Sequence, residues 1–128
     1  MGIDDEQSRD PSVRVILMPK DTNGHGTIFG GAILSHLDIA GAVEARKHTT
    51  HRVVTVAIDK VVFIAPVQVG DLVSFYTSTK RVGESSVTVT IDVEAERADG
   101  SGNAHVTSAT AVYVAVDGAG ASVPLVSA

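Results

Sequence analysis

The sequence predicts an α+β protein in which an antiparallel β-sheet wraps around one long central α-helix. Apolar residues at residues 30–47 recur at helical spacing around more than half of the helix circumference. The stretches that follow are rich in Val and Ile and are joined largely by short turns, which favour antiparallel strands. A helix that is apolar nearly all round is buried nearly all round. A curved sheet can cover such a helix, and a second subunit can cover what remains.

Composition predicts the elements up to the helix. Residues 1–12 are charged and lack periodicity, which predicts a flexible arm. "VRVILM" at residues 13–18 is rich in β-branched residues and predicts the first strand. Pro, Asp, Asn and Gly crowd into residues 19–27 and predict a loop, after which the helix begins.

After the helix we expect four strands and a loose end. The clearest strand is at residues 85–96, where Val and Ile alternate with polar residues. The others are expected at residues 52–66, 72–82 and 104–116. The Gly- and Ser-rich residues 118–128 predict a loose tail. One domain is therefore expected at residues 13–117.

Bulk properties restrict the function. A chain of 128 residues is long enough for one core but short for two. It has no cysteine, no apolar stretch near the about 20 residues of a membrane helix, and no apolar signal-peptide region at its start. We therefore expect a cytoplasmic protein with no membrane partner. A formal net charge of -5 argues against a nucleic-acid partner, because such binding normally needs clustered Lys and Arg.

Asp38 is the first candidate for chemistry, because it interrupts the most apolar part of the helix. A buried carboxylate without partners is strongly destabilising. One explanation is a pairing with Arg46, with Lys47 or with a backbone amide of another subunit. The other explanation is a general base or nucleophile in a dry pocket. The residues alone leave both explanations open.

The Gly-rich start of the helix is the second candidate. The first N–H groups of a helix have no acceptor within it, and Gly30 and Gly31 have no side chain to block them. These amides can point at a carbonyl or oxyanion, assisted by the helix dipole. Close packing of the helix start against a strand explains the glycines equally well. "GHGTIFGG" lacks the spacing and the βαβ context of a dinucleotide site.

The remaining candidates also have ordinary structural explanations. Asn23 lies in a Gly-rich turn, where Asn commonly bonds its own backbone. Of five scattered histidines, only His36 lies near Asp38 on the helix, and His48 and His51 would need a third ligand to bind a metal. A predicted β-turn offers either a site for an anionic group or a solvated hairpin tip, at Lys80, Arg81, Gly83, Ser85 and Ser86.

Four segments resemble the acyl-CoA thioesterases of the hotdog fold, in the branch of bacterial acyl-CoA hydrolases and cytosolic long-chain acyl-CoA hydrolases. They are "MPKDTNGHGTIFGGAILSHLDIAGAV", "RVVTVAIDKVVFIAPVQVGD", "KRVGESSVTVTIDV" and "ATAVYVAVD", in family order and spacing. The first segment is the most specific, and together they cover most of residues 13–117. The resemblance implies a long helix wrapped by an antiparallel sheet and paired with a second copy.

The resemblance also implies roles for individual residues. The family's loop asparagine falls on Asn23 and its helix acid on Asp38, and different subunits contribute these two residues around the thioester. The glycines at the helix start fall on Gly30 and Gly31, which implies an amide near the thioester carbonyl. The implied partner is a second copy, in a homodimer with shared active sites that can assemble further into a tetramer or hexamer.

The implied reaction is hydrolysis of acyl-CoA to a free fatty acid and CoA, with Asp38 as general base or nucleophile. No cofactor is expected, since coenzyme A enters as part of the substrate. A hotdog-fold enoyl-CoA hydratase or dehydratase is the nearest rival, but its characteristic His-containing loop is not recognisable. A non-enzymatic acyl-CoA sensor is the other, although such a regulator ordinarily carries a DNA-binding extension.

Overall fold

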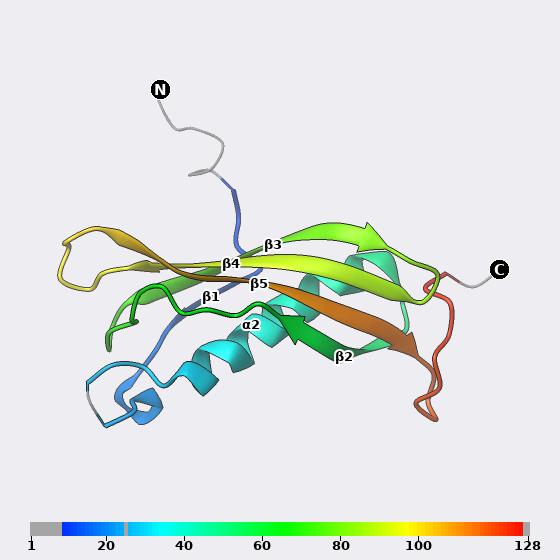
Figure 1. Cartoon of the computed structure of the whole chain (residues 1–128), viewed down its shortest axis with the longest axis horizontal. Coiled ribbons are helices and arrows are strands. Elements are labelled where there is room, and N and C mark those ends of the chain that lie inside the picture. Colours follow the sequence, from blue (N-terminus) through cyan, green and yellow to red (C-terminus); the bar gives the residue numbers. More distant parts are fainter. Residues whose placement is uncertain (1–8, 25, 127–128) are drawn as a thin grey trace.

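The computed structural model describes residues 9–24 and 26–126, and in them five strands surround one long helix (Figure 1). The strands are β1 (Val13–Ile16), β2 (Arg52–Asp59), β3 (Leu72–Val82), β4 (Ser86–Glu96) and β5 (Asn103–Val116). The helix is α2 (Gly30–Ala45), and short 3₁₀ turns are η1 (Pro19–Asp21) and η2 (Arg46–His48). The sheet order is β1-β3-β4-β5-β2, with every neighbouring pair antiparallel. His25 and most of the expected N-terminal arm lie outside the described residues.

The sheet curves around α2, mainly through β3 and β4 (Figure 1). The apolar residues of β4 all face the helix and are fully buried, while the polar residues between them are only partly buried. The helix fills the core with Ile33, Leu37, Ala40 and Ala45. This arrangement confirms the predicted α+β fold with an antiparallel sheet around one helix. Within the described residues, no helix is long and apolar enough to cross a membrane.

The second strand is shorter than predicted. β2 ends at Asp59 and does not reach residue 66, because Lys60 adopts the left-handed backbone conformation, with φ of 59°. Residues 61–66 continue as an irregular segment that is hydrogen-bonded to β5. A Val- and Ile-rich composition indicates burial or strand structure, but it does not reveal where a single residue turns the backbone.

The C-terminal end is more ordered than its composition suggests. Leu125 is buried, and its N–H donates to the Glu84 carbonyl at 2.8 Å. The Thr49 hydroxyl donates to the Leu125 carbonyl at 2.7 Å. The Gly- and Ser-rich sequence predicted a loose tail, but one leucine attaches the described part of it to the β3–β4 turn.

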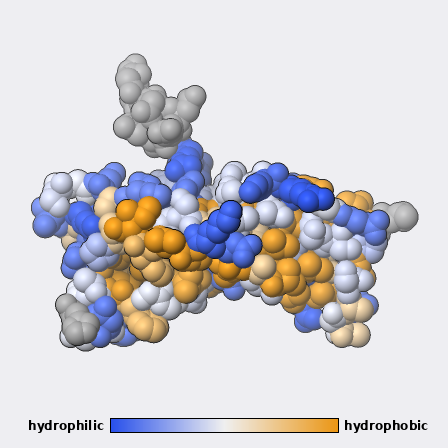
Figure 2. Space-filling model, viewed as in Figure 1, coloured by the Kyte–Doolittle hydropathy of each residue, from blue (hydrophilic) through white to orange (hydrophobic). Residues whose placement is uncertain are grey.

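Part of the apolar surface remains uncovered. On α2, Ile39 is 53% exposed and Val43 42%, and on β2 the side chains of Val54 and Val56 are also exposed. β2 lies at an edge of the sheet, so its outer side has no strand beside it among the described residues. Figure 2 shows hydrophobic surface over this region. Exposed edge strands and contiguous apolar patches are typical of interfaces.

Candidate active site

Asp38 receives hydrogen bonds from two strands. The Thr55 hydroxyl of β2 donates to Asp38 Oδ1 at 2.6 Å. The Tyr113 hydroxyl of β5 donates to the Asp38 carbonyl oxygen at 2.8 Å and lies 3.2 Å from Oδ1. Thr55 and Tyr113 are paired across β2 and β5, and the register shifts directly after Thr55. This cross-strand pair therefore directs two hydroxyl groups at Asp38. The register shift beside it is a β-bulge or similar irregularity, which is common near active sites.

Tyr113 reaches Asp38 across Gly41. A Cβ atom on Gly41 would lie 2.0 Å from the Tyr113 oxygen, so only glycine leaves room for the tyrosine. Tyr113 is 1% exposed. Burial raises the pKa of the Tyr113 hydroxyl well above its ordinary value, and the charge of Asp38 and the hydrogen bond to it act in the same direction. The hydroxyl therefore stays protonated and can donate to Asp38.

The intrachain salt bridge considered for Asp38 does not form. Among the described residues, no Lys, Arg or His lies within salt-bridge distance of its carboxylate. Lys47 pairs with Glu44 at 2.9 Å instead, because residues three or four apart share a helix face. Arg46 and Lys47 are more than two helical turns away from Asp38. Hydroxyl donors thus orient the carboxylate without bringing an opposite charge to it.

The sequence did not point to Thr55 or Tyr113 as partners of Asp38. They are separated from Asp38 by 17 and 75 positions along the chain. Both fall in stretches that the sequence identified only as strands. Their convergence depends on the register of β2 against β5, which the composition of a strand does not specify.

The glycines at the start of α2 lie against aromatic rings. A Cβ atom on Gly31 would lie 2.4 Å from the Phe29 ring, and one on Gly30 would lie 3.3 Å from the Phe63 ring. Phe29 precedes the helix and makes no side-chain cap. The glycines thus allow close packing, but against aromatic rings outside the strands and not against a strand as expected. This packing is compatible with amides that point outward from the helix start. Their interaction with a carbonyl stays a prediction.

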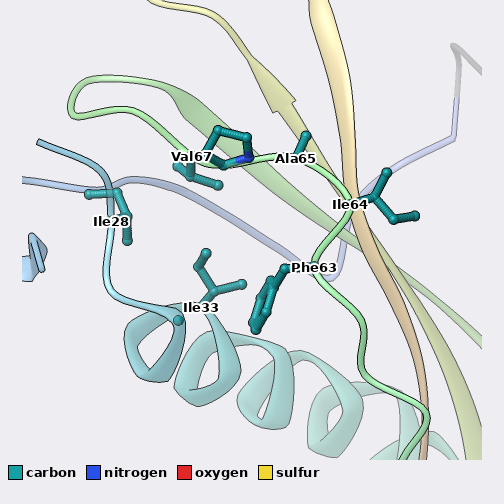
Figure 3. A pocket seen from close by; sticks show the side chains of 8 residues that line it. Ile28, Ile33, Phe63, Ile64, Ala65 and Val67 are labelled. Carbon is teal, nitrogen blue, oxygen red and sulfur yellow. The ribbon is translucent and has the colours of Figure 1, made fainter. Parts of the chain in front are cut away.

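An apolar cavity of about 290 Å³ opens beside this helix start (Figure 3). Its lining comes from the helix start and from the segment after β2: Ile28, Gly30, Ile33, Phe63, Ile64, Ala65, Pro66 and Val67. In Figure 3, Phe63 extends from the segment after β2 toward α2 and lies beside Ile33. The sequence did not single out Phe63, because an isolated Phe in an apolar stretch is most often a core residue.

Asn23 lies in the loop that leads to the helix. Gly24 and Gly26 turn this loop with φ of 88° and 89°, in the left-handed region that favours glycine. The Asn23 side-chain amide donates to the Thr27 hydroxyl at 2.8 Å, and its backbone N–H donates to the Thr27 carbonyl at 3.0 Å. The turn-forming role considered for Asn23 is thus present, and its side chain is exposed.

Asp38 and the helix-start amides of one chain do not converge. Asp38 follows Gly30 by eight residues in α2 (38 minus 30), which is about 12 Å along the axis at 1.5 Å per residue. Reacting atoms must approach one another to about 3–3.5 Å. Along one helix, the backbone positions of the two groups are thus several times farther apart than two reacting atoms.

The candidate anion-binding turn lies near the other end of α2 (Figure 1). The Gly83 N–H donates to the Ser86 carbonyl at 2.7 Å, and the Ala115 N–H donates to the Ser85 carbonyl at 2.9 Å. These bonds fit the hairpin explanation. The side chains of Lys80 and Arg81 are exposed. Contact with an anion stays a prediction for this turn.

A second carboxylate on α2, Glu44, is buried near the end of the helix. It accepts hydrogen bonds from Thr77 at 3.0 Å, from Thr79 at 2.7 Å and from Lys47 at 2.9 Å. Burial alone would raise the pKa of Glu44, but these hydrogen bonds and the Lys47 charge outweigh it, so the pKa lies below its ordinary value. Thr79 also bonds His48 Nε2 at 2.8 Å. The sequence missed this cluster because Glu44 belongs to the polar end of the helix.

His36 does not contact Asp38. Its ring stacks on Phe75 with 6.1 Å between centroids, and its Nδ1 lies 2.9 Å from the Ala32 carbonyl oxygen. Within residues 9–24 and 26–126, no three His, Asp or Glu side chains are grouped as they would be around a metal ion.

The sequence is similar to those of acyl-CoA thioester hydrolases. The family model for the thioesterase superfamily matches residues 25–100. An uncharacterized acyl-CoA thioester hydrolase of Haemophilus influenzae is 41% identical over 113 residues, which cover 86% of this chain and 73% of the relative. The acyl-CoA thioester hydrolase YciA of Salmonella typhimurium is 39% identical over 116 residues, 88% of this chain and 87% of the relative.

The fold is similar to those of solved thioesterases. A hexameric hotdog-fold thioesterase of Campylobacter jejuni has a TM-score of 0.86 at 44% identity, over 92% of this chain and 91% of that chain. HI0827, a hexameric broad-specificity acyl-coenzyme A thioesterase, has a TM-score of 0.87 at 37% identity, over 92% and 82% of the two chains. The hotdog fold that the sequence resemblance implied is thereby confirmed.

Proposed function

Because the chain belongs to the thioesterase superfamily, we propose that it is an acyl-CoA thioester hydrolase that converts acyl-CoA and water to a free fatty acid and CoA. The hydrolase names of its relatives, which match over most of both chains, favour this reaction over hydration and over sensing without turnover. The structural observation that carries the proposal is Asp38, a carboxylate on an apolar helix that two hydroxyl groups orient and no cation of the described chain neutralises.

In the proposed reaction the thioester carbonyl accepts hydrogen bonds from the Gly30 or Gly31 amide at the start of α2. These amides and the helix dipole stabilise negative charge on the carbonyl oxygen. As a general base, Asp38 takes a proton from water, the water oxygen bonds to the carbonyl carbon, and the C–S bond breaks. As a nucleophile, Asp38 bonds to the carbonyl carbon and displaces the CoA thiolate, and water then hydrolyses the resulting acyl–aspartyl anhydride to the fatty acid and free Asp38. On either route the CoA sulfur takes up a proton. Asn23 orients the water or the thioester.

The proposed active site is shared between two subunits. The separation of about 12 Å between Asp38 and the Gly30 amide along one helix supports this arrangement, since two helices side by side can bring one start to the other's Asp38. The exposed side chains of Ile39 and Val43, next to Asp38 in sequence, and the open edge of β2 supply an apolar surface for the partner. We propose a two-fold homodimer that assembles further into a hexamer, as its solved relatives do.

The proposed hydrolysis uses water, a carboxylate and backbone amides, so it requires no metal or redox cofactor, and CoA enters as part of the substrate. The turn with Lys80, Arg81 and Gly83 is the proposed contact for the CoA phosphates. A cytoplasmic location stays a prediction from the sequence.

Release of free thiol from a series of acyl-CoA substrates tests the proposed function. We expect the purified protein to release CoA from saturated thioesters between acetyl-CoA and palmitoyl-CoA. Turnover of an enoyl-CoA without thiol release would identify a hydratase. Tight binding of saturated acyl-CoA without thiol release would identify a sensor, and either outcome would reject hydrolysis.

A further inference from the structure

The cavity beside the start of α2 has features of a hydrocarbon site. We propose that it holds the acyl chain of the substrate and that Phe63 sets the length of chain that it accepts. This inference rests on the proposed thioesterase function, because it takes the helix start as the position of the thioester carbonyl. It assigns a specificity-determining role to a residue that does not take part in the chemical step.

The position of the cavity relates it to the carbonyl. Gly30 belongs to the helix start whose amides are proposed to bind the carbonyl oxygen, and it also lines the cavity. The Phe63 ring lies against Gly30, where an added Cβ atom would be 3.3 Å from it. A chain attached to a carbonyl carbon bound at this helix start would therefore enter the cavity next to Phe63.

The lining indicates which part of the substrate enters. Every side chain that lines the cavity is apolar. The pantetheine and nucleotide parts of CoA carry amides, hydroxyl groups and phosphates, and burying such groups without hydrogen-bond partners costs free energy. A hydrocarbon chain incurs no such cost and gains from leaving water. The acyl chain is therefore the part of the substrate that the cavity suits.

The wall that carries Phe63 is fixed by hydrogen bonds on both sides of the ring. The Thr107 hydroxyl donates to the Val62 carbonyl at 2.8 Å, and the Ile64 N–H donates to the Val106 carbonyl at 2.7 Å. The backbone on each side of Phe63 is thus attached to β5. The Phe63 side chain itself is 43% exposed, at the open side of the cavity. Because the backbone is held, the size of the side chain at position 63 determines the space available.

The volume sets a scale for the effect. A cavity of about 290 Å³ has room for several methylene groups. Each methylene that leaves water strengthens binding by about fourfold. Affinity should therefore rise with chain length while the cavity fills, and then level off.

The experiment compares wild type with Phe63→Ala and Phe63→Trp across acyl chains from acetyl to palmitoyl. Two quantities are measured: kcat/KM from thiol release, and Kd for 2-oxoalkyl-CoA thioethers, which keep the carbonyl but cannot be hydrolysed. Phe63→Ala removes six ring carbons, so the preferred chain should lengthen by roughly two to four carbons. Phe63→Trp should shorten it.

Val62→Ala is the matched control, because Val62 is on the same segment but does not line the cavity. Its chain-length profile should match that of wild type. An equal change of kcat/KM at every chain length in Phe63→Ala would overturn the inference. Unchanged chain-length profiles in both Phe63 variants would also overturn it. Neither result would contradict the proposed thioesterase function. If the protein hydrolyses no thioester but the Phe63 variants still shift the chain-length dependence of the thioether Kd, the proposed function is rejected and the acyl site is supported.

Discussion

Complementation between two inactive subunits tests the shared active site directly. In the proposed arrangement, Asp38 of one subunit acts with the loop and helix start of the other, because Asp38 and Gly30 of one chain lie about 12 Å apart along α2. An Asn23→Ala subunit and an Asp38→Ala subunit, each inactive alone, should therefore regain activity together. In a mixed dimer, one site receives both intact residues and the other site receives both substitutions.

The expected recovery follows from counting. Random two-fold pairing makes about half of the dimers mixed, and one of two sites is intact in each, so activity should return to about a quarter of wild type. The two subunits are co-expressed with different affinity tags, and thiol release is measured after the tags have shown that mixed dimers are present. Asp38→Ala subunits that carry the two tags are the control, and they should gain nothing.

Two outcomes would refute the reasoning. If Asn23 and Asp38 act within one chain, no site in any dimer is intact, and mixed dimers stay at the level of the single variants. A protein that remains monomeric in solution while hydrolysing acyl-CoA would reject the shared site sooner. Both substituted residues are outside the buried core, so unfolding is not the expected cause of inactivity, and circular dichroism of each variant checks this.

Four further predictions concern single features of the molecule. Asp38→Asn should lower kcat by about 10²- to 10⁴-fold with little change in CoA binding; a loss of a few-fold or less in the thiol assay contradicts a catalytic Asp38. Gly41→Ala places a methyl group against a buried tyrosine and should destabilise the protein by about 1–3 kcal/mol in urea unfolding; an unchanged free energy of unfolding contradicts the close packing of Gly41 on Tyr113. Replacing Lys80 and Arg81 by Ala should raise KM more than it lowers kcat, an effect that fades with salt; an unchanged KM at low ionic strength contradicts phosphate contact. The folded-state pKa of Glu44 is lowered, so the stabilisation from its ionised form is present above its unfolded pKa and is lost as pH falls through the folded pKa. The urea midpoint of wild type should therefore fall on the acid side more steeply than that of Glu44→Gln. Identical pH curves for the two proteins would contradict a stabilising role of ionised Glu44.

Strands with a marked alternation were predictable from the sequence because each of their faces has its own environment. β4 was expected at residues 85–96 and is found at Ser86–Glu96, where alternating positions face the helix. β3 was expected at residues 72–82 and has those bounds. A slip by one residue would turn every buried side chain of such a strand outward, so pattern and structure correspond closely.

Features that depend on contacts between distant parts of the chain were not predictable. Glu44 is buried because Thr77 and Thr79 of β3 face it, and the helix sequence contains no sign of them. Lys60 ends β2 although its neighbours are strongly strand-forming, since a single left-handed residue overrides local propensity. Part of a tail whose composition predicts looseness is held by the buried Leu125 and by backbone hydrogen bonds of Val123 and Leu125 to β5 and to the β3–β4 turn.

The surroundings of Asp38 show how the sheet and the proposed chemistry depend on one register. Thr55 and Tyr113 are cross-strand partners, and both donate to Asp38. A slip of β2 by one residue would place Val54 or Val56 opposite Tyr113 and leave the carboxylate with one donor fewer. The pairing of β2 with β5 that places Thr55 opposite Tyr113 therefore also holds the donors on Asp38, while the edge left open beside β2 is the surface proposed for the second subunit. In this way the strand that orients the carboxylate also lies where the partner is expected to supply the rest of the site.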